Sequence, residues 1–451
     1  MTATPVRCRV AERRYLALVL GIALLLRLAA MIQFLELDRL FADERYYART
    51  AASIVVGEGH PGSVRPPLQS FALAGFISLV GSDHTYVRAV QSLMSLLTPL
   101  LIFQVSARRF GTRAAFFSGL ACAISPGLVH YSHFLWAASL NATLLALWIW
   151  LFDHFERRGR LWILAAGGGV LGLAALTREI WLYAALPVGV WLCMREGWRW
   201  RRAAPGMLCF GLALVVTVAP WILRNSRLHG DLVTISTNHW APIGAGNVFP
   251  ADDWYLGSST LDRLRLFRAS PPFEDEFACQ AYWRGVALRR IAGEQPWWIF
   301  KKVIRNTAQL FKIKTQELRF ITKGYFKPTR TNALILLVTD LLGYALTMIP
   351  AILGLWLVPD RRLKSLVVMT LFMWLGVCWV ANAMPRFHVP ILPLLLLYSG
   401  PLLARAVDRK STPPWRFAGA AACVGIYIFL PLPLSIEYLG EFLSAVDRLR
   451  P

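Results

Sequence analysis

Two neighbouring acids, Asp43 and Glu44, follow the first long apolar run of the sequence. An ionisable group next to hydrocarbon is costly to keep and therefore marks a candidate functional site. A carboxylate there can accept a proton from an attacking hydroxyl, as Asp and Glu do in general base catalysis. The same acids also suit the first turn of a helix, where the helix dipole favours negative charge. The local sequence leaves both interpretations open and makes Asp43 and Glu44 the candidate catalytic residues.

Three arginines lie where each could bind an anionic group. Arg65 precedes two prolines that favour the first turn of a helix, and its guanidinium can hold a phosphate through two parallel hydrogen bonds. Arg178 and Arg386 are rare basic residues in short loops between apolar runs. Arg178 is followed by Glu179 and could pair with it, and each arginine could instead extend toward lipid headgroups. All three are candidate ligands for a phosphate.

Two lysines, Lys301 and Lys302, lie in a stretch over 296–305 that mixes aromatic and basic residues at helical spacing. This pattern is typical of an amphipathic helix in the headgroup layer of a membrane. A helix packed within a small folded cap outside the membrane explains the pattern equally well. In either arrangement the lysines could close over a bound phosphate, so both join the candidate ligands.

The composition requires a membrane around the elements that carry these residues. The chain has 451 residues, of which 56% are hydrophobic and 16% are charged, against about 25% charged residues in an average soluble protein. Lipid must cover part of this apolar surface. The net charge of +22 comes from basic residues between apolar runs, which indicates membrane topology and no nucleic-acid partner. The seven cysteines form no CxxC motif and predict neither a disulfide framework nor a metal site.

Eleven apolar runs approach the length of about 20 residues that a spanning helix needs. The sequence therefore predicts an all-α polytopic membrane protein with about eleven transmembrane helices. The runs cover 15–36, 86–107, 114–131, 139–155, 161–176, 180–194, 204–222, 332–358, 365–383, 389–406 and 415–435.

The basic clusters set the predicted orientation. If the runs alternate in direction, every cluster of arginine and lysine lies on one side, which the positive-inside rule assigns to the cytoplasm. The N-terminus is then inside and the C-terminus outside. Counting residues 66–81 as a further span would invert all later clusters, so this segment is predicted to be an interfacial helix on the outer face.

Three regions follow from this orientation. Residues 1–222 form an N-terminal transmembrane core whose first external loop, 37–85, carries the two acids. Residues 223–330 form a large external segment, and residues 331–451 form the C-terminal transmembrane helices. The chain shows no inverted repeat of the kind found in many transporters.

The order of these elements resembles a known family. An external Asp-Glu-x-x-Tyr element from Asp43 is followed by an interfacial helix that starts Pro-Pro-Leu, and then by spans joined through short loops. The segment 220–238 leads into the large external segment, and Pro-Arg-Phe-x-x-Pro-x-x-Pro begins at Pro385. Over about residues 10–410 the chain resembles the GT-C fold glycosyltransferases of the dolichyl-phosphate-mannose protein mannosyltransferase superfamily, in particular the bacterial branch that includes the lipid A aminoarabinose transferase.

The resemblance implies a function and a place. Such enzymes take a sugar from a polyprenyl-phosphate donor on the outer face of the bacterial cytoplasmic (inner) membrane and transfer it, with inversion, to a lipid, glycan or protein acceptor. One base and a phosphate leaving group are needed. The acid of the family's first loop matches Asp43, with Glu44 adjoining, and its basic residue before the Pro-rich helix matches Arg65.

Two departures from the family bear on metal binding. The aminoarabinose transferase has a Glu where this chain has Val64, and many relatives have an acid in the second external loop, where residues 132–141 contain none. We therefore expect no cofactor, with a divalent metal as the open alternative. Arginine and lysine can stabilise a leaving phosphate in place of a metal.

Two other function classes compete with the enzyme. A transporter or lipid flippase needs ionisable residues along a path through the membrane, and Arg27 and Arg88 are the candidates for that role. A membrane scaffold without catalytic activity is the second competitor. The acids of the first external loop and the large external segment favour an enzyme acting at the outer face.

Overall fold

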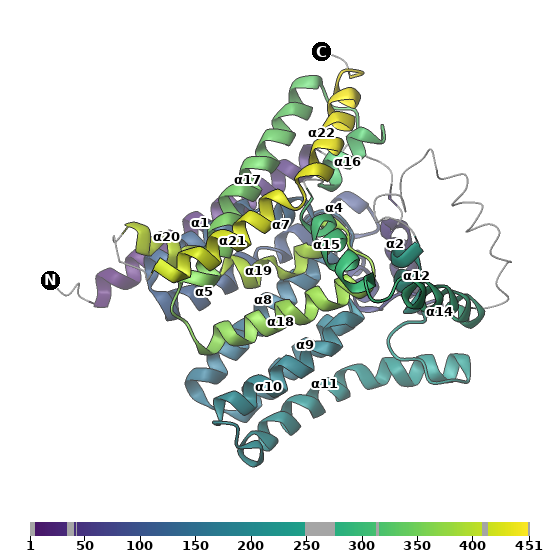
Figure 1. Cartoon of the computed structure of the whole chain (residues 1–451), viewed down its shortest axis with the longest axis horizontal. Helices are drawn as coiled ribbons and strands as arrows, with labels where there is room; N and C mark the ends of the chain where they lie inside the picture. Colours follow the sequence, from purple (N-terminus) through teal and green to yellow (C-terminus); the bar gives the residue numbers. More distant parts are fainter. Residues whose placement is uncertain are drawn as a thin grey trace.

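The described part of the chain is helical throughout. The computed structural model describes residues 5–33, 40–41, 43–248, 276–312, 315–407 and 414–449, and these contain helices and no strand. The prediction of an all-α protein is confirmed. Figure 1 shows long helices lying side by side in a bundle, with α2, α12 and α14 gathered at one end of it.

The N-terminal region supplies most of the bundle. Its elements are α1 (Pro5–Gln33), α2 (Asp43–Val55), α3 (Leu68–Val80), α4 (His84–Met94), α5 (Leu97–Phe110), α6 (Thr112–Ile124), α7 (Pro126–His130), α8 (Ala137–Arg158), α9 (Leu161–Ala175), the 3-10 helix η1 (Glu179–Ala184), α10 (Ala185–Arg195) and α11 (Trp200–His229).

The remaining elements belong to residues 223–330, which the sequence predicts to be external and which are called the external segment below, and to the C-terminal region. In the external segment they are α12 (Trp240–Val248), α14 (Glu276–Gly293), α15 (Trp298–Phe311) and α16 (Gln316–Thr322). The C-terminal region contains α17 (Arg330–Leu357), α18 (Arg362–Val380), the 3-10 helix η2 (Pro385–Ile391), α19 (Leu392–Leu396), α20 (Ser399–Val407), α21 (Pro414–Phe429) and α22 (Leu432–Val446).

Fewer helices than the predicted eleven meet the length and composition of a membrane span. Among the described residues there are six: Val10–Gln33, His84–Phe110, Trp200–His229, Arg330–Leu357, Arg362–Val380 and Ala418–Val446. A seventh forms if Pro385–Leu396 and Ser399–Val407, which meet at a bend of 45°, count as one. The other predicted runs fold as shorter or more polar helices: α9 has 15 residues, the run 180–194 divides into η1 and α10, and α8 includes Asn141 and Asp153.

The segment predicted to be interfacial forms α3. This helix begins after Pro67, ends at Gly81 and has 13 residues, which is too few to cross a bilayer. Gly81 has a φ of 85°, a backbone conformation that glycine adopts without strain. The helix ends at this glycine, and α3 packs against α2.

The helix that carries the two acids is amphipathic. Tyr47, Ala48 and Ala51 are buried. Ala51 follows Ala48 by three residues and Tyr47 by four, a spacing that places all three on one face of α2. Asp43 and Glu44 occupy the first turn, where the helix dipole favours them. The position of α2 against α3 thus fixes where both acids lie.

Close packing of α9 on α11 fixes another part of the site. A Cβ atom added to Gly168 would lie 2.2 Å from the carbonyl oxygen of Phe210, and one added to Gly172 would lie 2.7 Å from Cβ of Thr217. Small residues allow two helix backbones to approach this closely. Arg178, three residues after the end of α9, is consequently held at a defined position.

Candidate active site

A cavity of about 640 Å³ lies where the bundle meets the external segment. Its walls come from α2, the loop before α3, the start of α8, η1, α12, α14, the end of α18 and η2. Its charged and titratable lining residues are Asp43, Tyr47, Arg65, Arg178, Glu179, Tyr183, His239, Cys279, Cys378 and Arg386. Four of the residues that the sequence singled out therefore share one cavity.

Asp43 is the centre of a charged cluster in this cavity. One carboxylate oxygen lies 2.8 Å from Nη2 of Arg65, and the other lies 3.0 Å from Nη1 of Arg386. The three residues come from segments up to 343 positions apart in the sequence. The side chain of Asp43 is 15% exposed, so it contacts the cavity while most of it is shielded from water.

The arginines control the ionisation of Asp43. Burial alone would raise the pKa of this carboxyl, but the positive charges of Arg386, Arg65 and Arg178 outweigh burial and hold the pKa below its ordinary value. Asp43 is therefore ionised at neutral pH.

Arg178 lines the same cavity without an acidic partner. Its guanidinium lies 4.9 Å from the centroid of the Phe387 ring, a cation–π contact. Within the described part of the chain its side chain has no ion pair, and the pairing with Glu179 that the sequence allowed is absent because Glu179 contacts His239 instead. Arg386 likewise lies 5.1 Å from the ring of Trp136, which fixes its position beside Asp43.

The chain is similar to one family of glycosyltransferase sequences and to solved structures of membrane proteins. The family model described as dolichyl-phosphate-mannose-protein mannosyltransferase matches residues 64–223. The structure of ArnT from Cupriavidus metallidurans bound to undecaprenyl phosphate is similar, with a TM-score of 0.52 at 17% identity over 91% of this chain and 62% of that one. The apo oligosaccharyltransferase of Archaeoglobus fulgidus gives a TM-score of 0.50 at 15% identity over 96% of this chain and 56% of that one. No curated protein sequence matches.

The chain has the GT-C fold that it shares with these two structures, and its residues 64–223 match the mannosyltransferase family model. The fold implied by the order of sequence elements is thereby confirmed. The chain spans about three fifths of the length of the ArnT that it matches. The segment matched by the family model includes Arg65 and Arg178, whereas Asp43 and Arg386 lie outside it.

Glu44, the second predicted catalytic acid, is placed differently from Asp43. It is fully buried and does not line the cavity. Its carboxylate accepts hydrogen bonds from Nη1 of Arg88 at 2.8 Å, the backbone N–H of Leu135 at 2.9 Å and the backbone N–H of Phe41 at 3.1 Å. These bonds join the first external loop to α4 and to the second external loop. The geometry therefore favours a positioning role for Glu44.

The two predicted phosphate-binding lysines also lie outside the cavity lining. Nζ of Lys302 is buried and donates to the carbonyl oxygens of Gly246 and Ala381, each at 2.8 Å. Burial, together with the nearby charge of Arg305, lowers the pKa of Lys302 to about 7. Lys301 is 66% exposed and lies 3.8 Å from Glu294. In this structure Lys302 stabilises the cavity wall by its hydrogen bond to Ala381, and the side chain of Lys301 is exposed on the surface.

The helix α15 that carries these lysines is amphipathic, as predicted. Trp298 and Asn306 are buried on one face, while Trp297 and Phe300 are 64% and 61% exposed on the other. Asn306 donates to the carbonyl oxygen of Cys378 at 2.7 Å, near the end of α18. The buried face matches a packed helix of an external cap, and the exposed aromatic face matches a helix at a membrane surface. Both sequence interpretations are compatible with the structure.

The cavity also contains a contact between a carboxylate and a histidine that the sequence analysis did not predict. Nδ1 of His239 lies 2.6 Å from a carboxylate oxygen of Glu179. The two residues are 60 positions apart, and the sequence treated Glu179 only as a partner for Arg178. A single histidine at the start of a short external helix carries no pattern that points to a distant acid.

Within the described part of the chain, no group of three or more His, Cys, Asp or Glu side chains is arranged so that it could hold a metal ion. Asp43 is surrounded by arginines, which repel a cation. The acids at 252, 253, 274 and 275, in the external segment, lie outside the described residues.

Proposed function

We propose that this protein is a membrane glycosyltransferase that moves a sugar from a polyprenyl-phosphate donor to an acceptor hydroxyl on the outer face of the bacterial inner membrane. One observation carries the proposal. Asp43 meets Arg65 and Arg386 in a cavity that Arg178 also lines, at the junction of the bundle and the external segment. An anion-binding cluster around one carboxylate is suited to a reaction that needs one base and releases a phosphate.

The transfer is a single displacement with inversion. The acceptor oxygen forms a bond to C1 of the sugar while the bond from C1 to the phosphate oxygen breaks. The acceptor proton passes to the Asp43 carboxylate, and the bonding electron pair leaves with the polyprenyl phosphate. Preorganised positive groups aimed at the developing charge contribute about 2.7–4 kcal/mol each, by analogy with oxyanion-hole donors. Arg65, Arg178 and Arg386 supply such groups.

Donor binding prepares the base. A general base works best when its pKa lies near the operating pH, whereas the arginines hold the pKa of Asp43 low. A donor phosphate would compete with Asp43 for Arg65 and Arg386 and would add a negative charge nearby. Both effects raise the pKa of the carboxyl. Asp43 therefore becomes a better proton acceptor once the donor is bound.

The transporter alternative loses its two candidate residues. Arg27 is buried, and it donates to the hydroxyl of Ser95 at 2.8 Å and to the carbonyl oxygen of Ala23 at 3.1 Å. Arg88 is bound to Glu44. Both arginines hold elements together, which supports an enzyme over a transporter or flippase.

Deletion of the gene tests the proposal. Mass spectrometry of envelope lipids, glycans and glycoproteins should show a sugar modification that disappears in the deletion strain and returns with the wild-type gene. Asp43→Asn should fail to restore it. An envelope composition unchanged by the deletion would overturn the proposed function.

A further inference from the structure

The cavity contains a hydrogen-bonded relay that the proposed transfer does not use. Glu179, the first residue of η1, contacts Nδ1 of His239 at 2.6 Å, and Nε2 of His239 lies 3.1 Å from the hydroxyl oxygen of Thr234. Glu179 and His239 line the cavity. The relay joins the bundle to the external segment just before α12.

The relay has the chemistry of a hydroxyl-binding site. A carboxylate on one ring nitrogen of a histidine fixes the proton there and orients the ring, which leaves the other nitrogen to bind a partner. Here Nδ1 contacts Glu179, and Nε2 contacts the Thr234 hydroxyl. The hydrogen bond to Glu179 raises the pKa of His239, which shows that the two groups interact closely. The contact with Thr234 shows that an alcohol oxygen fits at Nε2.

The histidine of the relay is more exposed than the acid of the charged cluster. The side chain of His239 is 42% exposed, against 15% for Asp43. Ser236 and Asn238 adjoin it in the lining, and Trp283 of α14 contributes an aromatic ring. His239 therefore lies at an open part of the cavity lining, bordered by the external segment, where a second substrate can enter while the arginines hold the donor.

We infer that the Glu179–His239 pair binds the acceptor, through a hydroxyl beside the one that receives the sugar. This inference rests on the proposed transfer. Asp43 takes the proton of the reacting hydroxyl, so the relay requires another hydroxyl on the same acceptor. A saccharide or a glycolipid headgroup offers neighbouring hydroxyls, whereas a Ser or Thr side chain offers one. The acceptor is accordingly a saccharide, and its hydroxyl takes the place of Thr234 at Nε2.

His239→Phe tests the inference because it keeps a ring and removes both nitrogens. The cellular level of the glycosylated saccharide should fall at least tenfold, because the acceptor loses an anchor. Binding of undecaprenyl phosphate to the purified variant should stay within about twofold of wild type. His239→Gln should restore part of the product, since an amide can bind both Glu179 and a hydroxyl. Thr234→Val should retain transfer because the acceptor displaces this hydroxyl.

His229 supplies the matched control. It also lies in the outer part of the chain, with Nε2 at 2.6 Å from the Ser63 hydroxyl and 3.9 Å from Glu276, but it does not line the cavity. His229→Phe should therefore keep the product level. Thermal unfolding of both purified variants reports whether either one is misfolded, and Glu179→Gln, which keeps the size of the side chain, repeats the test from the other partner.

The outcomes separate this inference from the proposed function. A deletion strain with unchanged envelope glycans, glycolipids and glycoproteins contradicts the transfer itself. If the missing sugar was attached to Ser or Thr of proteins, the transfer stands and the saccharide acceptor is wrong. Full product with His239→Phe overturns the relay's role, and so does an equal loss of product and of undecaprenyl phosphate binding in both His239→Phe and Glu179→Gln.

Discussion

Two clusters of arginines and acids in this molecule use the same residue types in opposite ways. The cavity cluster places Arg65, Arg178 and Arg386 around the single acid Asp43. A second cluster, here called the balanced network, places three arginines against three acids: Arg108, Arg109, Arg157, Asp153, Glu156 and Asp360. The cavity cluster thus carries an excess of two positive charges, whereas the charges of the balanced network cancel.

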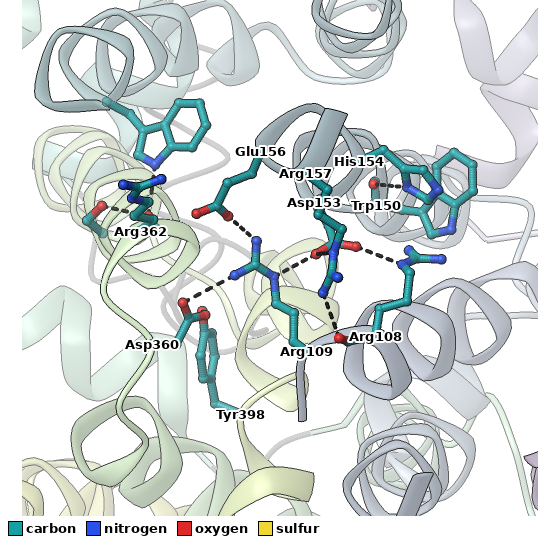
Figure 2. Close-up of polar contacts among 12 residues, drawn as sticks. Arg108, Arg109, Trp150, Asp153, His154, Glu156, Arg157, Asp360, Arg362 and Tyr398 are labelled. Carbon is teal, nitrogen blue, oxygen red and sulfur yellow. Dashed lines mark hydrogen bonds and ion pairs between the residues drawn. The ribbon is translucent and has the colours of Figure 1, made fainter. Parts of the chain in front are cut away.

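The balanced network joins the ends of helices. Figure 2 shows Asp153 of α8 between Arg108 and Arg109 of α5. One carboxylate oxygen of Asp153 lies 2.8 Å from Nε of Arg108, and the other lies 2.7 Å from Nε of Arg109. Arg109 also reaches Asp360 before α18, at 3.3 Å, and the hydroxyl of Tyr398 donates to Asp360 at 3.0 Å. None of these residues lines the cavity. This closed network ties α5, α8 and the start of α18 together.

The difference between the clusters teaches how to separate function from scaffold. A set of ion pairs whose charges cancel has little net attraction for a substrate anion, and its value lies in fixing the geometry of the helices that it joins. An unbalanced cluster that faces a cavity retains attraction for an anion from outside. The predictions below test this distinction, starting with the largest expected effect on transfer.

Asp43→Asn should reduce the rate of sugar transfer by about 10²–10⁴-fold, the usual cost of losing a general base. Size is preserved, so the variant should insert and purify normally. The measurement is turnover in washed membranes, with Glu58→Gln as the control, because Glu58 is an exposed acid near the end of α2. Near-normal turnover by Asp43→Asn would move the base to another residue.

Arg178→Ala should slow transfer by about 10²–10³-fold, the range found for loss of one preorganised charge-stabilising donor. Because Arg178 has no ion-pair partner in the described part of the chain, its removal leaves no acid uncompensated. Arg178→Lys should recover part of the rate, since an ammonium cannot present the planar fork of a guanidinium. Arg290→Ala, on the exposed surface of α14, is the control. Equal rates for both alanine variants would remove Arg178 from phosphate binding.

Asp153→Asn should lower the stability of the protein and leave its transfer activity intact, the reverse of the two substitutions in the cavity cluster. It leaves Arg108, Arg109 and Arg157 without their shared acid, and breaking a buried pair from one side costs about 3–5 kcal/mol. We expect about 3 kcal/mol, the lower end, because Arg108 and Arg157 are partly exposed. Thermal unfolding measures the loss, and transfer per folded molecule should match wild type. A stable variant with lost transfer would show that the balanced network takes part in function.

The sequence allowed prediction of the fold and of the charged cluster for definable reasons. Basic clusters alternate with apolar runs in a way that only a polytopic protein requires, and the order of the short elements indicates the GT-C class. Arg386 stood out because basic residues are rare in the short outer loops. Arg65 stood out because it precedes two prolines at the start of a predicted helix. These signals are local and need no knowledge of packing.

The rest of the site depends on packing that no local pattern reveals. Asp43 and Glu44 point about 100° apart around the axis of α2; Asp43 lines the cavity, and Glu44 is held away from it by its contact with Arg88. Lys302 lies on the inward face of α15 because the end of α18 lies there. The Glu179–His239 pair joins two segments 60 positions apart. Each of these features follows from tertiary contacts.

The pH dependence should show a smaller effect, in two parts. The folded-state pKa of Asp43 is below its unfolded value of about 3.9, so its contribution to stability is present above that value and is lost as the pH falls through the folded pKa. The difference in unfolding temperature between wild type and Asp43→Asn should shrink over that acidic range.

In kinetics, the acidic limb of the pH profile of kcat should lie at higher pH than the acidic limb of kcat/KM, because the bound donor raises the pKa of Asp43. Coincident limbs would contradict priming of the base by the donor.

Chelation should have the smallest effect of all. The cavity cluster already supplies the positive field that a leaving phosphate needs, since two charges remain after Asp43 is counted. To bind Asp43, a divalent cation would have to enter beside Arg65 and Arg386, against their charge, and compete with them for its carboxylate. EDTA should therefore leave the rate of transfer in washed membranes within about twofold of the untreated rate, because side-chain cations stabilise the leaving phosphate without a metal. If chelation abolished transfer and added Mg²⁺ or Mn²⁺ restored it, the cluster would be an incomplete site. The acids at 252, 253, 274 and 275 in the external segment would then be the first candidates for the missing ligands, and their replacement by amides should reproduce the effect of EDTA.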